Sequence, residues 1–275
     1  MSTELPTFET LLTREHAGVL HITLNRPEVR NAMSPLMVDE LGQALAYAEA
    51  GGEVRAVVLR GAAGHFCAGG DLRGVVAARD GETANDSSSD PVADPVAEIS
   101  AAFGEMCVAF AGTGLATVAV LEGTVMAGGM GLACVVDVAL AGESAVFRLP
   151  ETSIGLVPAQ IASFLVERVG YSQARRLAVT AGRIDARTAL ALGLVHEVHP
   201  DHQLDAARDA VLADILACAP AALAATKALM ARTRATHPDQ LVQEAATAYA
   251  RSARGPEGME GIAAFFDKRK PPWAG

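Results

Sequence analysis

The chain has 275 residues, of which 51% are hydrophobic and only 4% aromatic, so it can bury a sizeable core made mostly of Ala, Val and Leu. Its formal net charge of -10 at pH 7 argues against nucleic acid and anionic membranes as partners, because both require a dominant basic face. The N-terminus has no basic-then-apolar signal region and no apolar run looks long enough to cross a bilayer, so we expect a soluble cytoplasmic protein.

The cysteine and histidine patterns do not predict a metal site. The four cysteines are well separated, form no C-x-x-C pair, and in three cases lie in apolar contexts that favour reduced, buried thiols. His196 and His199 have no carboxylate or cysteine partner at ligand spacing, so we interpret them as surface histidines at the end of a strand. The cysteines are Cys67, Cys107, Cys134 and Cys218.

The first 60 residues alternate between strand and helix patterns. Residues 10–24 predict a β-hairpin that turns at residues 16–18. Ser34 and Pro35 supply an N-cap and a first helical residue, and an amphipathic helix should follow to about residue 50. Residues 54–60 predict another short strand. The order strand, strand, helix, strand indicates a layered α/β fold.

A first glycine-rich element, GAAGHFCAGGDL, occupies residues 61–72 between this strand and a helix start. Asp71 is suited to capping that helix, whereas the backbone of Gly69 and Gly70 is suited to approaching a ligand and offering an N–H donor. The element has neither a Walker A nor a G-x-G-x-x-G pattern, so it does not predict a nucleotide phosphate cradle or a Rossmann site.

Residues 79–95 are polar, acidic and rich in Ser and Pro, which predicts a mobile surface loop. Such a loop is either an inert insertion or a lid over a nearby site. An amphipathic helix should follow from about residue 96 to residue 111.

A second glycine-rich element, AGGMGLA at residues 127–133, follows a predicted buried strand at residues 118–121. A strand-to-helix turn of this kind presents unpaired backbone N–H groups, which suit a developing negative charge, although the glycines also suit close helix packing. A second apolar run covers residues 135–141. Beyond it, Glu151 stands next to a proline in an apolar neighbourhood, where a carboxylate with a raised pKa could serve as an acid or base.

The remainder of the chain is predominantly helical. Two helices are predicted at residues 160–170 and 172–180, and Ala-rich helices follow from about residue 204 to the end. Such helices pack either on the α/β core or on another subunit. The basic tail Lys268-Arg269-Lys270 is either solvated or in contact with a phosphate. The later helices are expected at residues 205–217, 221–232, 239–253 and 256–266.

Taken in this order and spacing, the elements resemble the enoyl-CoA hydratase/isomerase (crotonase) superfamily over nearly the whole chain. The carriers of the resemblance are Leu24-Asn25-Arg26-Pro27 with Asn31-Ala32, residues 65–72, Gly123 with Ala127-Gly128-Gly129, Asp137, Leu149-Pro150-Glu151 with Gly155, and the tail Glu257-Gly258 with residues 264–271.

The resemblance implies an α/β fold with a crotonase-like ββα spiral core at residues 1–200 and a C-terminal helical region at residues 201–275. That second region would serve oligomerisation and CoA capping in a homotrimer or hexamer. The implied partner is an acyl-CoA substrate. Coenzyme A would enter as part of that substrate, with no separate cofactor.

The resemblance also implies roles for individual residues. The backbone N–H groups of Gly70 and Gly128 would stabilise a thioester enolate, and the carbonyl region of Ala68 would receive adenine. Lys268, from a neighbouring subunit, would lie near a CoA phosphate, with Arg26 as a second candidate. Further contacts with CoA would come from Asp71, Leu72 and Phe265.

One position departs from the pattern of the two-glutamate hydratases. Their first catalytic glutamate is replaced here by Gly131, whereas Glu151 occupies the second position. A single carboxylate resembles Δ3,Δ2-enoyl-CoA isomerases and some hydratases and hydratase-lyases. The sequence of residues 149–161, together with the basic tail, resembles that of the isohexenylglutaconyl-CoA hydratase branch.

We therefore expect hydration of an unsaturated acyl-CoA or migration of its double bond, with Glu151 as general acid and base. The alternatives are thioester hydrolysis or C–C cleavage in the same pocket, and a non-catalytic CoA-binding or RNA-binding module. The acidity of the chain weighs against RNA.

Overall fold

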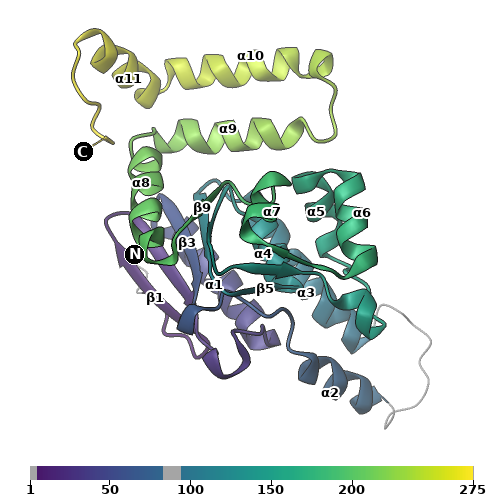
Figure 1. Ribbon diagram of the computed structural model, residues 1–275. Helices are drawn as coiled ribbons and strands as arrows, with labels where there is room; N and C mark the ends of the chain where they lie inside the picture. The colour runs from purple at the N-terminus through teal and green to yellow at the C-terminus, as the bar shows by residue number, and fades with distance from the viewer. Residues whose placement is uncertain (1–4, 83–93, 275) are drawn as a thin grey trace.

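A computed structural model describes residues 5–82 and 94–274. The chain forms a six-stranded sheet in the order β1-β2-β3-β4-β6-β9 and a three-stranded sheet in the order β5-β7-β8 (Figure 1). The strands of the larger sheet are β1 (Leu11–His16), β2 (Val19–Leu24), β3 (Ala56–Gly61), β4 (Ala116–Leu121), β6 (Val138–Gly142) and β9 (Glu197–His199). Those of the smaller sheet are β5 (Thr124–Met126), β7 (Val146–Arg148) and β8 (Arg183–Asp185).

The predicted hairpin at the start of the chain is confirmed. β1 and β2 pair antiparallel with His16 opposite Val19, and the two residues between them, Ala17 and Gly18, both have positive φ angles of 50° and 75°. Two consecutive positive φ angles give the turn whose twist matches that of a β-hairpin. From β2 onward the larger sheet is parallel, with helix α1 (Pro35–Gly51) connecting β2 to β3.

The helices begin and end close to the predicted residues. Ser34 caps α1 by accepting a hydrogen bond from the backbone N–H of Met37, and Asp94 caps α3 in the same way. The helices that follow α1 are α2 (Leu72–Glu82), α3 (Pro95–Gly112), α4 (Gly128–Val135), α5 (Ile161–Val169), α6 (Tyr171–Thr180), α7 (Ala186–Ala191), α8 (Leu204–Leu216), α9 (Pro220–Arg232), α10 (Pro238–Arg254) and α11 (Pro256–Phe266).

The middle strands β3 and β4 of the larger sheet are buried on both faces, and alternate residues of each strand point to opposite sides. On one side, Leu20 and Leu59 join the main core with α1 and α3. On the other side, Val58 and Val118 pack against Leu212 of α8 in a second core. The helix α8, which the sequence analysis placed in the C-terminal region, is therefore also one layer of the α/β core.

From β4 to β7, consecutive strands of the chain alternate between the larger and the smaller sheet. β4 of the larger sheet is followed by β5 of the smaller sheet, and β6 is followed in the same way by β7. Helix α4 comes directly after β5. This stepwise repetition of two strands and a helix is the ββα spiral that the sequence predicted, and it delivers both glycine-rich turns to one side of the molecule.

Two sequence predictions need correction here. The polar loop was expected to start at Arg79, but α2 continues to Glu82 because the helix that begins after Asp71 extends for three turns. The rest of the expected loop, at residues 83–93, lies outside the described residues.

By length and apolar composition alone α3 could cross a membrane, contrary to our estimate from the sequence. It instead packs against α1, α2 and α4 as a helix of the core.

The C-terminal helices project away from the sheets in the order α9, α10, α11 (Figure 1). Two ion pairs connect them to the core among the described residues: Lys227 of α9 donates to Asp137 at 2.6 Å, and Arg234, just after α9, donates to Glu167 of α5. Asp137 also accepts hydrogen bonds from Thr117 of β4. The expected division between residues 200 and 201 stays a prediction.

The cysteines follow their predicted environments. Cys67, Cys107 and Cys134 are buried and Cys218 is exposed, all four as free thiols. Burial raises the pKa of each of the three buried thiols to about 12, so they are protonated and unreactive at neutral pH.

Helix α4 depends on one arginine from the next helix. All eight residues of α4 are buried, and none of its own side chains can satisfy the carbonyl groups at its C-terminus. Arg168 of α5 donates to the carbonyl oxygens of Cys134 at 2.8 Å and of Ala133 and Val136 close by. A cation in this position also complements the negative end of the helix dipole.

We therefore expect Arg168→Met to lower the free energy of unfolding by roughly 2 kcal/mol, because buried carbonyl groups lose a charged donor. Urea unfolding followed by circular dichroism measures this change. Arg176→Met is the matched control, since the Arg176 side chain bonds only Gln173 at the surface of α6 within the described residues. Equal destabilisation by both variants would show that Arg168 does not have this role.

Candidate active site

The two glycine-rich turns and Glu151 meet at one cavity of ≈ 280 Å³, although they are far apart in the sequence. The cavity is enclosed by α2, α3, the start of α5 and the 3-10 turn η4 (Glu151–Ile154). Its lining is mostly apolar, as expected of a site that excludes water from a bound acyl chain. It is lined by Met33, Pro35, Val38, Ala68, Gly70, Asp71, Leu72, Val75, Ile99, Ser100, Ala102, Phe103, Ala127, Gly128, Pro150, Glu151, Ile154, Leu156, Val157, Pro158, Ala159, Gln160 and Ile161.

The first glycine-rich turn lies directly against the second. Gly69 has a φ of +106°, and a Cβ atom there would come within 2.5 Å of the Ala127 Cβ and 3.5 Å of the Gly128 nitrogen. Only glycine permits this conformation and this approach. The next residue, Gly70, faces open space, and the hydrogen bonds from Met33 N–H to the Gly69 carbonyl and from Asp71 N–H to the Met33 carbonyl hold its backbone.

The second turn presents the start of α4 to the cavity. Ala127, which precedes the helix, has an unusual conformation with φ 48° and ψ -123°, and its N–H donates to the Arg148 carbonyl at 3.0 Å. A Cβ atom on Gly128 would lie 2.6 Å from the end of the Met33 side chain. Within the described residues, neither the Gly70 nor the Gly128 N–H makes a hydrogen bond. Two free backbone donors therefore line the same cavity.

Glu151 supplies a buried carboxylate to this cavity. Its side chain is 9% exposed, and its Oε2 atom is buried without a hydrogen-bond partner in the described structure. Burial raises the pKa of Glu151 above the ordinary value of 4.5. The turn that carries it is fixed by hydrogen bonds from the Leu156 N–H to the Glu151 carbonyl and from Thr152 Oγ1 to the Ala178 carbonyl.

The wall at Gly131 is filled by apolar side chains. A Cβ atom at Gly131 would lie 3.1 Å from Cγ1 of Ile161 and 3.2 Å from Cζ of Phe103. A side chain at this position would therefore require both residues to shift by a few tenths of an ångström. Phe103 and Ile161 thus pack tightly where a first glutamate would begin, and Glu151 is the one carboxylate in the described lining that is not paired with a cation.

The candidate CoA residues of the first turn lie at this cavity. Ala68, Asp71 and Leu72 all line it. The Arg26 side chain is not free, since its guanidinium donates to Asp71 at 2.9 Å and to the Ala32 carbonyl at 2.7 Å. Burial would raise the pKa of Asp71, but the hydrogen bond and charge of Arg26 outweigh it and lower that pKa. Arg26 and Asp71 thus form a pair that braces the first turn.

The structure does not bring Phe265 and Lys268 to the cavity of their own chain. Phe265 lies in α11 and is 79% exposed, and Lys268 follows that helix in a backbone conformation with φ 54°. In Figure 1, α11 is far from α2 and α3, which border the cavity. A contact between these residues and CoA therefore needs a second subunit, and it stays a prediction.

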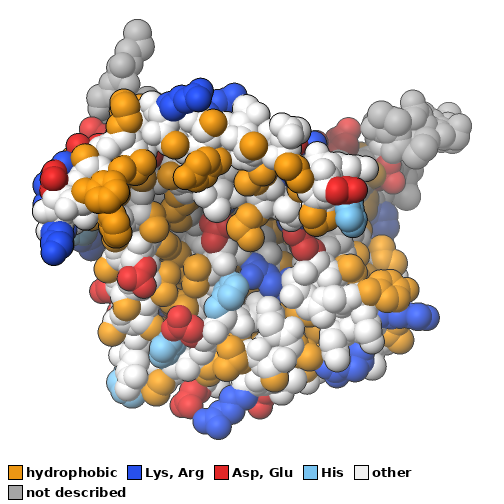
Figure 2. All heavy atoms as spheres, turned by 90° about the horizontal axis from the view of Figure 1, so that it is seen from above, with side chains coloured by type: hydrophobic (Ala, Val, Ile, Leu, Met, Phe, Trp, Pro, Cys, Tyr) orange, Lys and Arg blue, Asp and Glu red, His pale blue; other side chains and the backbone are white. Residues whose placement is uncertain are grey.

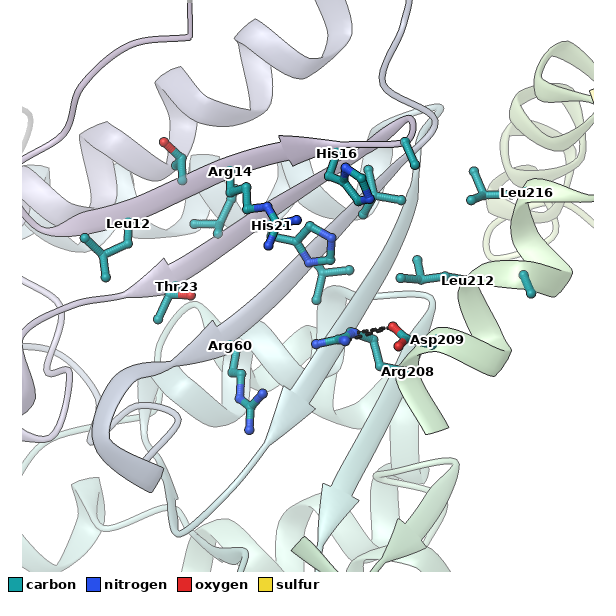
Figure 3. Close-up of a pocket in the computed structure, with 16 residues that line it drawn as sticks. Leu12, Arg14, His16, His21, Thr23, Arg60, Arg208, Asp209, Leu212 and Leu216 are labelled. Atoms are coloured by element: carbon teal, nitrogen blue, oxygen red, sulfur yellow. Dashed lines mark hydrogen bonds and ion pairs between the residues drawn. The ribbon is translucent and has the colours of Figure 1, made fainter. Parts of the chain in front are cut away.

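A larger cavity of ≈ 660 Å³ lies between the outer face of the β1–β2 hairpin and α8 (Figure 3). Arg208 in this cavity pairs with Asp209 at 2.8 Å, and burial, with Arg208 and Arg14, lowers the pKa of His21. Its described lining has no glycine turn and no unpaired buried carboxylate. We therefore assign the chemistry to the smaller cavity.

The described residues contain no group of three or more His, Cys, Asp or Glu side chains placed to hold a metal ion. His196 is exposed and accepts a hydrogen bond from the Ala139 N–H, and His199 pairs with Glu197 at 2.7 Å. Both histidines therefore have structural partners at the end of the large sheet.

Sequence reasoning missed four lining residues that shape the cavity. Phe103 and Ile161 close the position at Gly131, and Ser100 and Gln160 form a polar pair at 3.3 Å. The amphipathic pattern of residues 96–111 could have placed Phe103 on an inward face. No local signal could have paired Ser100 with Gln160, because they are 60 residues apart.

Known proteins resemble this chain in sequence and in fold. A family profile described as enoyl-CoA hydratase/isomerase matches residues 14–275. The chain is 31% identical to the enoyl-CoA hydratase ACTT6 of Alternaria alternata, over 91% of this chain and 79% of that protein. It is 32% identical to the mitochondrial enoyl-CoA hydratase domain-containing protein 2 of Mus musculus, over 96% of this chain and 87% of that protein.

Solved structures agree with this result. An enoyl-CoA hydratase/isomerase from Marinobacter aquaeolei superposes with a TM-score of 0.91 at 45% identity, covering 97% of this chain and 99% of the other. Pseudomonas aeruginosa AtuE superposes with a TM-score of 0.91 at 47% identity, covering 97% and 100%. With its ββα spiral and its two glycine turns at one cavity, this chain belongs to the enoyl-CoA hydratase/isomerase family and is an enzyme of that family.

Proposed function

We propose that this enzyme adds water to the double bond of an enoyl-CoA, with migration of the double bond as a second reaction of the same site. The observation that carries the proposal is one buried, unpaired carboxylate, Glu151, in a cavity that also holds two free backbone N–H donors. The names of its relatives as enoyl-CoA hydratases support water addition.

The two N–H groups would stabilise the charge that forms during the reaction. When the thioester oxygen lies at Gly70 and Gly128, electrons that move from the double bond onto that oxygen meet two fixed donors. This charge is larger in the transition state than in the substrate, so the donors lower the barrier selectively. Loss of one such donor typically costs about 10²–10³ in rate.

Glu151 would carry the proton. In hydration, its carboxylate takes a proton from water as the water oxygen bonds to C3, and the π electrons of the double bond move to the thioester oxygen. The enolate then returns its electrons to C2, which takes the same proton from Glu151. In double-bond migration, Glu151 removes a proton from one carbon and returns it to another, and no water is added.

The acyl chain is the finer part of the proposal. We infer a branched acyl group of the isohexenylglutaconyl type, which the sequence of residues 149–161 supports. The apolar side chains Ile154, Leu156 and Val157 at the cavity suit such a chain. A cytoplasmic location is also proposed, and the three buried free thiols support it.

We further propose that the protein is a homotrimer or a hexamer of two trimers, assembled through its C-terminal helices. Figure 2 looks down on these helices and shows hydrophobic side chains in a band across them. Contiguous exposed apolar surface of this kind supports an interface. The exposed apolar residues of α9, α10 and α11 are Met230, Val242, Tyr249, Met259, Ile262, Phe265 and Phe266.

The reaction class is tested with a panel of enoyl-CoA thioesters of varied branching, followed by mass spectrometry. Hydration adds the mass of one water, whereas double-bond migration leaves the mass unchanged. Release of free CoA would instead favour thioester hydrolysis. Absence of all three changes across the panel would contradict the proposed function and favour a CoA-binding module.

Glu151→Gln should remove most of the activity and stabilise the fold at the same time. Loss of an acid/base group typically costs about 10²–10⁴ in rate. Because the folded pKa of Glu151 is raised, the native state loses stability as pH rises from 4.5 through that pKa, where the unfolded state ionises first. The variant should therefore melt higher than the wild type at pH 7, with the difference vanishing below pH 4.5.

Thermal unfolding as a function of pH and the hydration assay measure the two effects. Glu105→Gln, on the exposed side of α3, is the matched control and should change neither. A Glu151→Gln variant that keeps full activity would contradict the role of this carboxylate.

Gly131→Glu should not create a second catalytic glutamate. Its Cβ atom would crowd Phe103 and Ile161, so we expect lower activity and a lower melting temperature. The hydration assay and thermal unfolding measure both. Higher hydration activity with an unchanged melting temperature would show that the wall can open to admit the side chain.

The intact protein should sediment as a trimer or hexamer. Removal of residues 256–275 should weaken both assembly and CoA affinity, because the charge of Lys268 is lost from a phosphate contact. Lys268→Ala alone should weaken CoA binding, measured by calorimetry, while assembly persists. A monomer at micromolar concentration would contradict the proposed assembly.

A further inference from the structure

A pair of neutral polar side chains in the cavity has no role in the reaction described so far. The described lining contains four polar or charged side chains: Asp71, Ser100, Glu151 and Gln160. Asp71 is engaged by Arg26, and Glu151 is the acid/base group. Ser100 of α3 and Gln160 at the start of α5 therefore remain as the uncommitted polar groups.

The position of Gln160 depends on a glycine. The Gln160 side chain lies over Gly104 of α3, where a Cβ atom would come within 2.5 Å of Oε1 and 2.7 Å of Cδ. Its Nε2 atom donates to Ser100 Oγ at 3.3 Å. Gly104 is buried in the face of α3 that packs inward. The amide is thus held by one hydrogen bond and by a slot that only a residue without a side chain provides.

The amide keeps hydrogen-bonding capacity after its bond to Ser100. One N–H and the acceptor sites of Oε1 have no protein partner among the described residues. The buried, unpartnered polar side-chain atoms of the described chain are Arg55 Nε and Glu151 Oε2, and those of Gln160 are not among them. The unpartnered atoms of the Gln160 amide are therefore not fully buried, and because Gln160 lines the cavity, a water molecule there can reach them.

The amide belongs to the chain neighbour of a residue that packs against Gly131, the position that lacks a carboxylate. Phe103 and Ile161, which block Gly131, are the close chain neighbours of Ser100 and Gln160 on the same two helices. The same wall of the cavity, tightly packed at Gly131, thus also carries a neutral amide. A neutral group leaves the titration of Glu151 undisturbed, whereas a second carboxylate would couple to it.

We propose that Gln160, held by Ser100 and by the slot over Gly104, binds the water that adds to the enoyl-CoA. This inference rests on the proposed hydratase function. The amide oxygen accepts one O–H of the water and directs the other O–H to the Glu151 carboxylate. The water oxygen bonds to C3 as Glu151 takes the second proton, the π electrons move to the thioester oxygen, and Glu151 then protonates C2.

The test compares a reaction that needs water with one that does not. Solvent deuterium exchange at the γ carbon of an enoyl-CoA needs Glu151 and the backbone donors, but no added water. In Gln160→Leu we expect the kcat for hydration to fall roughly 10- to 100-fold, the effect of one lost hydrogen bond to a reacting group. Deuterium exchange should stay within about twofold of the wild type, since the exchange machinery is intact.

Two further variants test whether hydration depends on the position of the Gln160 amide, while Gln160 itself is kept. Gly104→Ala places a methyl group in the slot and displaces the flexible end of Gln160, so it should also reduce hydration and spare exchange. Gly112→Ala in the same helix meets no atom within 4 Å and is the matched control, which should leave both rates unchanged. Ser100→Ala should give the same selective loss to a smaller degree, and it provides a milder variant should Gln160→Leu fail to fold.

Every result of these assays either supports or overturns the role of Gln160 in binding the water. Hydration that is unchanged in Gln160→Leu and Gly104→Ala overturns the inference, and so does an equal loss of hydration and exchange, which marks a purely structural role. A wild-type enzyme that exchanges deuterium but adds water to no enoyl-CoA overturns the hydratase function itself. Selective loss of hydration in a wild-type enzyme that hydrates its substrate establishes the inference.

Discussion

The close approach of two glycine turns is the contact on which the site depends. Gly69 lies against Ala127 and the nitrogen of Gly128, so two segments that are almost 60 residues apart in the chain act as one surface. A side chain at Gly69 would push the turns apart, and with them the two N–H donors of the proposed site. The parallel sheet makes the contact possible, because β3 and β4 are neighbours and their following loops leave at the same edge.

The site lowers the free energy of unfolding, and the rest of the fold must offset this loss. A buried carboxylate without a partner, such as that of Glu151, destabilises the native state whenever it is ionised. The same lack of partners is what the proposed acid/base role requires, because no protein group competes for the proton. Around it, hydrogen bonds of the η4 turn and the arginine at the end of α4 fix the backbone.

Gly131 and Gly104 show how absent side chains can define an active site. At Gly131 the missing side chain lets Phe103 and Ile161 close the wall. At Gly104 the missing side chain leaves a slot for Gln160. Both glycines lie in helices, where this residue costs about 1 kcal/mol relative to alanine. Their presence in helices is understandable only from what packs against them.

The sequence alone was sufficient to predict the hairpin, the capped helices and the alternation of strands and helices, because turns, caps and hydrophobic periods act between near neighbours. It also marked the two glycine-rich turns and Glu151, since glycine-rich strand ends and a carboxylate beside proline are local signals, and the family resemblance then implied Gly70 and Gly128 as the donors. Only the tertiary structure decided that Arg26 braces Asp71 and that Gln160 lies over Gly104. Those contacts depend on how separate helices and turns pack, and side-chain direction across such distances is not encoded in any short stretch of chain.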